Sequence, residues 1–416
     1  MKNNMIIKIM LFLGCVLCSD VFACTTGIVS GKHTVDGRPL LFKQRDSEQA
    51  DNVFVYSNSG RYSYIGVVPI GDMDNRRVVF GHNEKGLAIM NSNSYNLESP
   101  DKNGMTKGNL IRLGLEKCAT VAEFEELLRT LAPFAYGSNY GCLDATGACA
   151  YLECGAEGVE RFDADDPKAA PHGYIVRSNF GMSNDPKKGK GYARYTEASD
   201  LFEAAASQHQ LSWKEIFSFS RSLHHGWTKT DLNKLIPAQE SDTALYAFRD
   251  YIPRYITAST VVYQGVRPGE SPLLTTAWTS IAHPLTTVCM PIWFGGGHCL
   301  PKCVQRNSEG RCSLVDWSNV LKRYLFPIEY GEGNDYIMLS HLINQEGTGV
   351  FQQIVPLENR IIEEGERYLH RFRESNCIND DYINYYQWVD QFIEQEYPLI
   401  ISSHSLTLQT KSGTPL

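Results

Sequence analysis

The sequence predicts a mixed α+β fold, and three observations carry this prediction. Runs rich in β-branched and aromatic residues, bounded by Gly, Asn or Asp, fill most of residues 25–93. Two helical patterns follow at 109–131, and a second group of strands and then helices completes the chain. Strands and helices grouped in this way are typical of layered α+β architectures. No internal repeat or low-complexity linker interrupts the pattern.

The first strands are expected to pair through short turns. The runs 25–31 and 39–46 are joined by Val35-Asp36-Gly37, which is a hairpin signal. The other expected strands are 52–57, 62–70, 76–83, 87–93, 141–155 (a hairpin), 173–182, 256–266 and 273–282.

The helices are expected from apolar residues at a period of three to four. The pattern predicts one helix over 109–118 and a second that Thr120 caps, with Glu123 completing a capping box. The later helical patterns are 195–208, 213–223, 228–236, 359–374 and 380–397.

Composition excludes several classes of protein. The 416 residues carry a formal net charge of −8 with both signs interspersed and no basic stripe, which argues against nucleic acid as a partner. With 43% hydrophobic and 11% aromatic residues the chain can bury a substantial core. Beyond the N-terminus no apolar run reaches about 18 residues, so no membrane span is expected. We expect one domain over 24–416, with a helical insertion around 196–240 and a helical C-terminal region over 340–400.

The first 23 residues have the features of an export signal. Lys2 gives a basic start, residues 5–14 are largely apolar but too short to span a bilayer, and Val21-Phe22-Ala23 ends in the small residues that signal peptidase reads. We therefore expect cleavage after Ala23 and a periplasmic or secreted protein.

Ten of the twelve cysteines lie outside the signal, and export would place them in an oxidising compartment. Two of the three residues Cys299, Cys303 and Cys312, which lie in a Gly- and Pro-containing loop, are expected to form a disulfide. A zinc site that includes His298 is the alternative, but the spacing fits no paired-ligand pattern. No metal or cofactor is expected.

Cleavage after Ala23 would make Cys24 the first residue. Its thiol and its own α-amine would then lie on one residue, with unperturbed pKa values near 8.5 and 8, so the amine can serve as the general base. Other interpretations of Cys24 remain. It can be an incidental residue beside a cleavage site, or the lipidated residue of a surface lipoprotein, although Val-Phe-Ala lacks the usual Leu.

Two other cysteines offer rival interpretations. Lipidation at Cys15 would leave Cys24 blocked by upstream residues. Cleavage at Gly141-Cys142 would create a different N-terminal cysteine, but Cys142 lies within an expected strand. A cysteine–histidine protease is disfavoured because no cysteine has a local signature of that class.

The stretch "CTTGIVSGKHTVDGRPLLFKQRDS" resembles the start of N-terminal-nucleophile cysteine hydrolases. In the secreted dipeptidase branch, mature chains begin Cys-Thr-Thr and reach an Asp-Gly turn and an Arg-Asn-x-Asp-Ser stretch, here Lys43 to Ser47. "FGHNEKGLAIMNSN" is similar to a block of choloylglycine hydrolases and penicillin V acylases. "YGCLDATGACAYLECG" and "VRSNFGMS" look like blocks of the penicillin-acyltransferase-like branch. The resemblance covers residues 24–194, with a weaker similarity at 257–284, and it implies a four-layer αββα sandwich.

The resemblance also implies roles for individual residues. Cys24 would be the nucleophile, and Asp46 would contact its α-amine. Lys43 falls where most relatives have an arginine beside the thiol; Arg45 is a rival for that role because positions 43 and 45 share one face of a strand. The implied roles of three further residues are oxyanion stabilisation for Asn93 and Asn179, and a place near the active centre for Arg194. The alternatives are ordinary ones: strand or helix-start cations, and asparagines in turns.

The function implied is hydrolysis of a C–N amide bond through a thioester on Cys24. The expected substrates are small molecules: an N-acyl amide, a conjugated bile acid, a penicillin-like amide or a dipeptide. Acyl transfer from the same thioester, a lipid-anchored binding protein and a catalytically degenerate relative are the alternatives. A homo-oligomer is compatible with the sequence.

Overall fold

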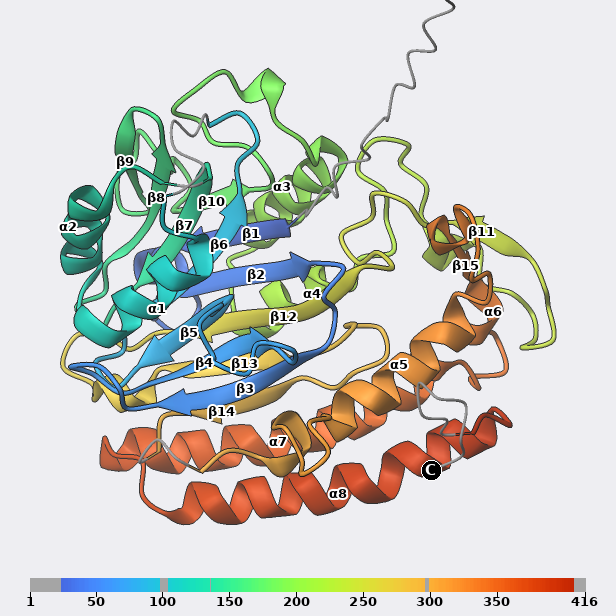
Figure 1. Cartoon of the computed structure of the whole chain (residues 1–416). Helices are drawn as coiled ribbons and strands as arrows, with labels where there is room; N and C mark the ends of the chain where they lie inside the picture. Colours follow the sequence, from blue (N-terminus) through green and yellow to red (C-terminus); the bar gives the residue numbers. More distant parts are fainter. Residues whose placement is uncertain (1–23, 98–103, 135, 296–298, 408–416) are drawn as a thin grey trace, which may run out of the picture.

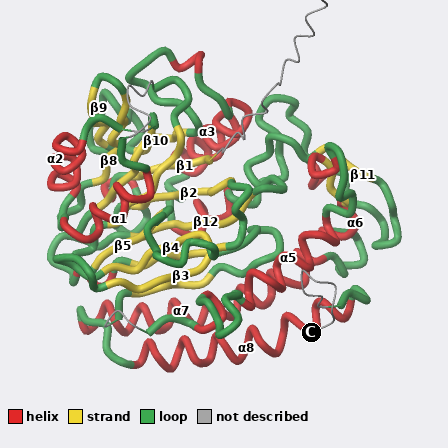
Figure 2. The backbone as a smooth tube through the Cα atoms, in the orientation of Figure 1, coloured by secondary structure: helices red, strands yellow, loops and turns green. Residues whose placement is uncertain are grey.

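The computed structural model describes residues 24–97, 104–134, 136–295 and 299–407. Two large antiparallel sheets stack face to face in the middle, and helices cover them on both sides (Figure 1). The same arrangement is visible in Figure 2, where helices flank the central strands. The expected signal segment, residues 1–23, lies outside the described residues.

The first sheet has six strands in the order β10-β1-β2-β12-β13-β14, so the chain enters it near its edge and returns to it twice. β1 and β2 form the hairpin that the Val35-Asp36-Gly37 turn predicts. Gly37 has φ +75°, a backbone conformation that favours glycine. The strands are β1 (Cys24–Val29), β2 (Leu40–Asp46), β10 (Tyr174–Arg177), β12 (Thr257–Gln264), β13 (Thr276–Ser280) and β14 (Met290–Trp293).

The second sheet is a meander of seven strands in sequence order, β3 to β9, with every neighbour antiparallel. Its strands are β3 (Asn52–Ser57), β4 (Tyr64–Pro69), β5 (Phe80–Asn83), β6 (Ala88–Asn93), β7 (Ser138–Leu143), β8 (Cys149–Gly155) and β9 (Gly158–Asp163). β1 and β2 lie against β6 and β7, so the core of the protein is the space between the sheets. Cys142 lies within β7, as expected.

Helices α1 (Lys107–Lys117) and α2 (Val121–Leu131) cover the outer face of the second sheet. The Thr120 side chain accepts a hydrogen bond of 3.2 Å from the Glu123 N–H, which confirms the predicted cap of α2. Helices α3 (Tyr192–Ser207) and α4 (Trp213–Phe219) cover the first sheet, where Trp213 stacks on Trp278 with ring centroids 3.6 Å apart. Four layers result, and the α+β fold prediction is confirmed.

The C-terminal part is a group of helices that packs beside β14. α7 (Val350–Ser375) contacts β14 and runs beside α8 (Asp381–Ser403), which also contacts α5 (Ser313–Leu325); α6 (Leu339–Leu342) is a short link. A two-stranded sheet, β11 (Leu245–Ala247) with β15 (Tyr336–Met338), stands apart from the two large ones. Within the described residues, no helix is both long enough and apolar enough to cross a membrane.

The secondary-structure prediction was wrong in particular places. Residues 228–236 were expected to be helical, but only 232–234 form a single 3₁₀ turn. Residues 228–231 instead belong to a turn that is closed by the hydrogen bond from the His225 N–H to the Thr230 carbonyl and by the bridge between His224 and Asp231. The elements predicted from the sequence did not include β9, β14 and α5. β14 is only four residues long and contains Pro291, which weakens its strand signal. Helices α3 and α4 overlap the expected insertion around 196–240 and pack on the first sheet as one of the four layers; the expected domain division stays a prediction.

Candidate active site

Cys24 is the first residue of β1 and is 7% exposed. It pairs with Arg45 on β2, and Thr26 pairs with Lys43. Residues that pair directly across antiparallel strands point to the same face, and positions two apart share that face. Cys24, Lys43 and Arg45 therefore all face the second sheet, as expected for positions 43 and 45.

The backbone of Cys24 is held on both sides. Its N–H donates a hydrogen bond of 2.9 Å to Asn179 Oδ1, and its carbonyl accepts bonds of 2.8 Å from Arg194 Nη1 and 3.2 Å from Ser178 Oγ. Arg194 Nη2 also donates to Asn179 Oδ1 at 2.9 Å. Because two donors meet at that atom, it must be the oxygen of the amide. Asn179 thus holds the backbone nitrogen of Cys24.

Arg194 comes from the first turn of α3 and is 1% exposed. Besides the two bonds above, its Nη1 donates to Thr25 Oγ1 at 2.9 Å. Gly191, before the helix, has φ +82°, and a Cβ there would lie 2.3 Å from Arg194 Nη2. Only glycine lets the chain turn this close to the guanidinium. Burial lowers the pKa of Arg194, and nearby Asp46 opposes that shift.

Lys43 and Arg45 occupy different polar niches on the same face. Lys43 Nζ donates to Val79 O at 2.8 Å and to Asn91 Oδ1 at 3.0 Å, whereas Arg45 Nη1 donates to Gln49 O and Asn52 Oδ1. Burial lowers the pKa of Lys43 to about 7 and that of Arg45 to about 10, and in both cases the negative charge of Cys24 opposes the shift. Both cations are therefore electrostatically coupled to Cys24.

The described hydrogen bonds of Asp46 do not include the nitrogen of Cys24, and its expected contact with the α-amine stays a prediction. Its carboxylate accepts hydrogen bonds of 2.9 Å from Arg254 Nε and 2.7 Å from Thr257 Oγ1, and the nitrogen of Cys24 is bound by Asn179 instead. The register explains this, because Cys24 pairs with Arg45 and leaves Asp46 one residue beyond the pair. Burial raises the pKa of Asp46, and the charge of Arg254 opposes the shift. In this structure Asp46 ties the end of β2 to the start of β12.

Asn93 and Asn179 lie next to each other, but their side chains make different contacts. Asn179 Nδ2 donates to the Asn93 backbone carbonyl at 3.1 Å, while the Asn93 side-chain oxygen accepts a hydrogen bond from Lys107 Nζ. Asn179 therefore binds the Cys24 nitrogen with its side-chain oxygen and the Asn93 backbone carbonyl with its side-chain nitrogen. Sequence reasoning missed Lys107, whose only signal is its place at the start of a helix.

These residues surround a cavity of about 260 Å³. Cys24, Lys43, Arg45, Asp46 and Asn93 line it; Asn179 and Arg194 lie behind Cys24. The other lining residues are Ser47, Gln49, Pro69, Arg77, Val78, Val79, Asn91, Ser92, Thr106, Lys107 and Gly108. Strands of both sheets and the first turn of α1 thus meet at one site.

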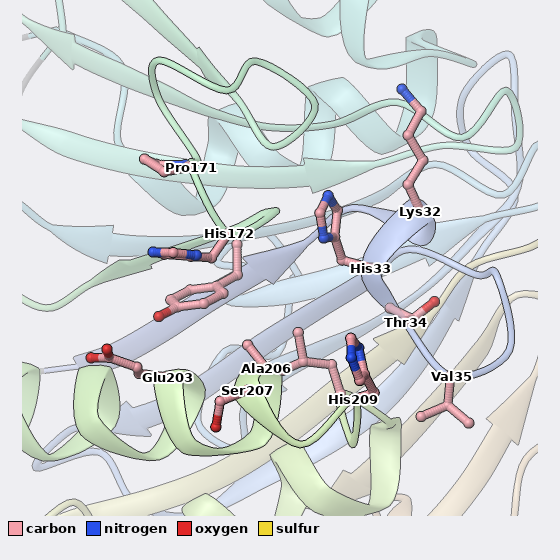
Figure 3. Close-up of a pocket in the computed structure, with 12 residues that line it drawn as sticks. Lys32, His33, Thr34, Val35, Pro171, His172, Glu203, Ala206, Ser207 and His209 are labelled. Atoms are coloured by element: carbon pink, nitrogen blue, oxygen red, sulfur yellow. The ribbon is translucent and has the colours of Figure 1, made fainter.

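A larger cavity of about 620 Å³ lies at the other end of β1 (Figure 3). His33, His172 and His209 are among the residues around it, together with Glu203. The six residues of β1 separate it from Cys24 by roughly 20 Å. No cysteine lines this cavity, so the smaller one is the candidate active site.

The cysteines of the described residues are all free, so the expected disulfide among Cys299, Cys303 and Cys312 is not formed. Cys303 and Cys312 are both buried, and the Cys312 thiol instead approaches the Cys303 backbone carbonyl at 3.1 Å. His298, part of the alternative zinc site, lies outside the described residues. Among the described residues no cluster of three or more His, Cys, Asp or Glu side chains could hold a metal.

Residues 36–212, less than half of the chain, match the family described as acyl-coenzyme A:6-aminopenicillanic acid acyl-transferase. The predicted resemblance to N-terminal-nucleophile enzymes is confirmed over this segment. The family consists of amidohydrolases and acyltransferases. The match contains Lys43, Asp46, Asn93, Asn179 and Arg194 and begins after Cys24, whose place is known from the geometry above.

The chain also matches solved structures at low sequence identity. A variant of conjugated bile acid hydrolase from Clostridium perfringens is 15% identical, with 66% of this chain and 94% of that chain covered and a TM-score of 0.40. Penicillin V acylase from Agrobacterium tumefaciens is 14% identical (65% and 86% covered, TM-score 0.40). The Caenorhabditis elegans orthologue of N-acylethanolamine-hydrolyzing acid amidase is also 14% identical (60% and 93% covered, TM-score 0.37). A search of curated proteins gives no match.

Proposed function

We propose that this chain is an exported amide hydrolase whose nucleophile is Cys24, freed by cleavage after Ala23. The observation that carries the proposal is the double hold on Cys24: Asn179 Oδ1 fixes its nitrogen while its side chain lines the cavity beside Lys43 and Arg45. A nucleophile and its base held in a fixed geometry on one residue meet the requirement for covalent catalysis without a histidine.

The reaction begins with transfer of the thiol proton to the α-amine. The thiolate sulfur attacks the amide carbonyl carbon, and the carbonyl oxygen takes the negative charge of the tetrahedral intermediate. The intermediate collapses as the C–N bond breaks, and the α-ammonium returns the proton to the leaving amine. Water then attacks the thioester with the α-amine again as base, which releases the carboxylic acid and the thiol.

The surrounding cations stabilise the charged states of this cycle. Lys43 and Arg45 share the face of Cys24. Their positive charges favour the thiolate of Cys24 and the oxyanion of the tetrahedral intermediate. Arg194 acts as a positioning residue, because it binds the backbone of Cys24 and the side-chain oxygen of Asn179 and does not line the cavity. Asn93 lines the cavity and is the candidate oxyanion donor.

The candidate substrates are small amides: N-acyl amides, conjugated bile acids, penicillin-like amides or dipeptides. The names of the structural neighbours, which include a bile acid hydrolase and a penicillin acylase, support this range. Acyl transfer is the second candidate reaction, because the matched family is named for an acyltransferase. In that reaction an amine in place of water would accept the acyl group from the same thioester.

Reaction of the exported protein with p-nitrophenyl hexanoate tests the nucleophile. We expect a burst of one p-nitrophenol per chain, no burst for Cys24→Ala and an unchanged burst for Cys377→Ala, since Cys377 is the exposed cysteine of the described residues. An added amine such as hydroxylamine distinguishes the two reactions by their products, because hydrolysis gives hexanoic acid and acyl transfer gives the hydroxamate. Absence of the burst would favour the degenerate relative, and a lipid mass on Cys24 would favour the lipoprotein.

A further inference from the structure

The cavity around Cys24 has a marked excess of positive charge. Four cationic side chains line it, Lys43, Arg45, Arg77 and Lys107, against one carboxylate, that of Asp46. Asp46 is bound by Arg254 from outside the cavity. A single thiolate would balance at most one of the four cations.

Of the four cations, only Arg77 has a carboxylate partner in an ion pair within the described residues. The ion pairs of that part of the chain include none for Lys43, Arg45 or Lys107. Arg77 Nε lies 3.8 Å from Asp72 Oδ1, and the arginine side chain is 48% exposed. Burial lowers the pKa of Lys107 to about 8 and that of Lys43 to about 7, as expected for cations buried without a compensating anion.

Lys107 and Arg77 meet at one side of the cavity because of Gly108. A Cβ at Gly108 would lie 2.8 Å from the Arg77 Cα, so only glycine lets the first turn of α1 approach this segment. The preceding residue, Thr106, makes no side-chain cap on α1, and it lines the cavity with Lys107 and Gly108. The positive end of the helix dipole therefore adds to the two side-chain charges.

We infer that the cavity takes amide substrates that carry a negatively charged group such as a carboxylate, and that Lys107 and Arg77 bind that group. The inference rests on the proposed function, since it concerns the substrate of the same site. Lys43 and Arg45 come from β2 and share the face of Cys24, whereas Lys107 and Arg77 come from the α1 side of the cavity. Lys107 also interacts with the charge of Cys24, and Arg77 Nη1 donates to Gln49 Oε1 at 3.2 Å, so a substrate anion would add to these contacts. Pro69, Val78 and Val79 give the same cavity an apolar side for the rest of the molecule.

Two matched pairs of probes test the inference. The mono-p-nitrophenyl ester of adipic acid and p-nitrophenyl hexanoate differ by a carboxylate on the acyl side. N-hexanoylglycine and N-hexanoylglycinamide differ by a carboxylate on the amine side. We expect at least a tenfold preference in kcat/KM for the acid in one pair, and the pair that shows it tells which side of the scissile bond Lys107 and Arg77 contact.

The readout is the acid-to-neutral ratio, because Lys107 also holds Asn93 and its loss would slow both substrates. In Lys107→Gln and Arg77→Gln the ratio should fall at least fivefold, while Lys85→Gln, which removes an exposed lysine outside the cavity, should leave it unchanged. No preference in either pair, or a preference that both variants keep, would overturn the inference. An acyl adduct on Cys24 without any preference refutes the inference alone, whereas no adduct with any ester refutes the proposed function.

Discussion

The guanidinium of Arg194 donates a hydrogen bond of 2.8 Å to the backbone carbonyl oxygen of Cys24. The same side chain binds Asn179, whose oxygen accepts the N–H of Cys24, so one residue of α3 fixes both polar groups of the first β1 residue. The position of Cys24 thus depends on the contact between α3 and the sheet that it covers.

Arg194→Lys should lower kcat about 100-fold with little change in KM. A lysine cannot bind the Cys24 carbonyl, Thr25 and Asn179 at once, and a small misplacement of reacting groups costs about this much. Steady-state kinetics with p-nitrophenyl hexanoate measure the effect, with Arg129→Lys on the exposed face of α2 as control. An unchanged kcat in Arg194→Lys would show that the backbone hold on Cys24 is not needed.

Lys43→Arg should change the pH dependence of activity. Burial lowers the pKa of Lys43 to about 7, so the wild-type side chain loses its charge as the pH rises through 7, whereas an arginine keeps it. Because a positive charge favours the thiolate, the ratio of kcat/KM in Lys43→Arg to that in the wild type should rise above pH 7. The other groups coupled to Lys43 are Cys24, Arg45 and Lys107. A ratio that stays constant from pH 6 to 9 would contradict this role.

Asp46→Asn should lower the free energy of unfolding by about 3 kcal/mol, because it removes the buried negative charge that Arg254 Nε binds at 2.9 Å, and the ion pair of Arg254 with the half-exposed Asp250 is longer, at 3.8 Å. Arg254 is 17% exposed and the Asp46 side chain is fully buried, so water cannot replace the lost charge. Urea denaturation measures the change. The matched control is Asp74→Asn, whose pair with Arg76 is exposed and should cost less than about 1 kcal/mol. Equal losses in both variants would refute the structural role of Asp46.

Gly27→Ala should reduce both stability and activity. A Cβ at Gly27 would lie 2.5 Å from the Phe202 ring, so α3 would have to shift away from β1 and take Arg194 with it. Overpacking of this kind costs about 1–3 kcal/mol. Thermal unfolding and kcat are measured in Gly27→Ala and in Gly27→Ala/Phe202→Leu, where the smaller side chain should restore much of both. If the double variant is no better than the single one, the clash is not the cause.

Local signals in the sequence predicted much of this structure and part of the site. The Asp36-Gly37 turn and the Thr120 cap are local, and the structure has both. The contacts of Asp46 and Asn179 depend on strand register and on Arg254, which is more than 200 residues from Asp46 in the sequence. Lys107 enters the cavity only because Gly108 lets α1 approach Arg77, a tertiary contact that no local pattern encodes.

Intact-mass and tandem mass spectrometry of the exported Cys377→Ala protein, after brief reaction with p-nitrophenyl hexanoate, test the central claim most directly. The account predicts a chain that begins at Cys24 and carries one hexanoyl group on that residue. A chain that begins elsewhere, a lipid on Cys24, or a hexanoyl group on any other residue would contradict it.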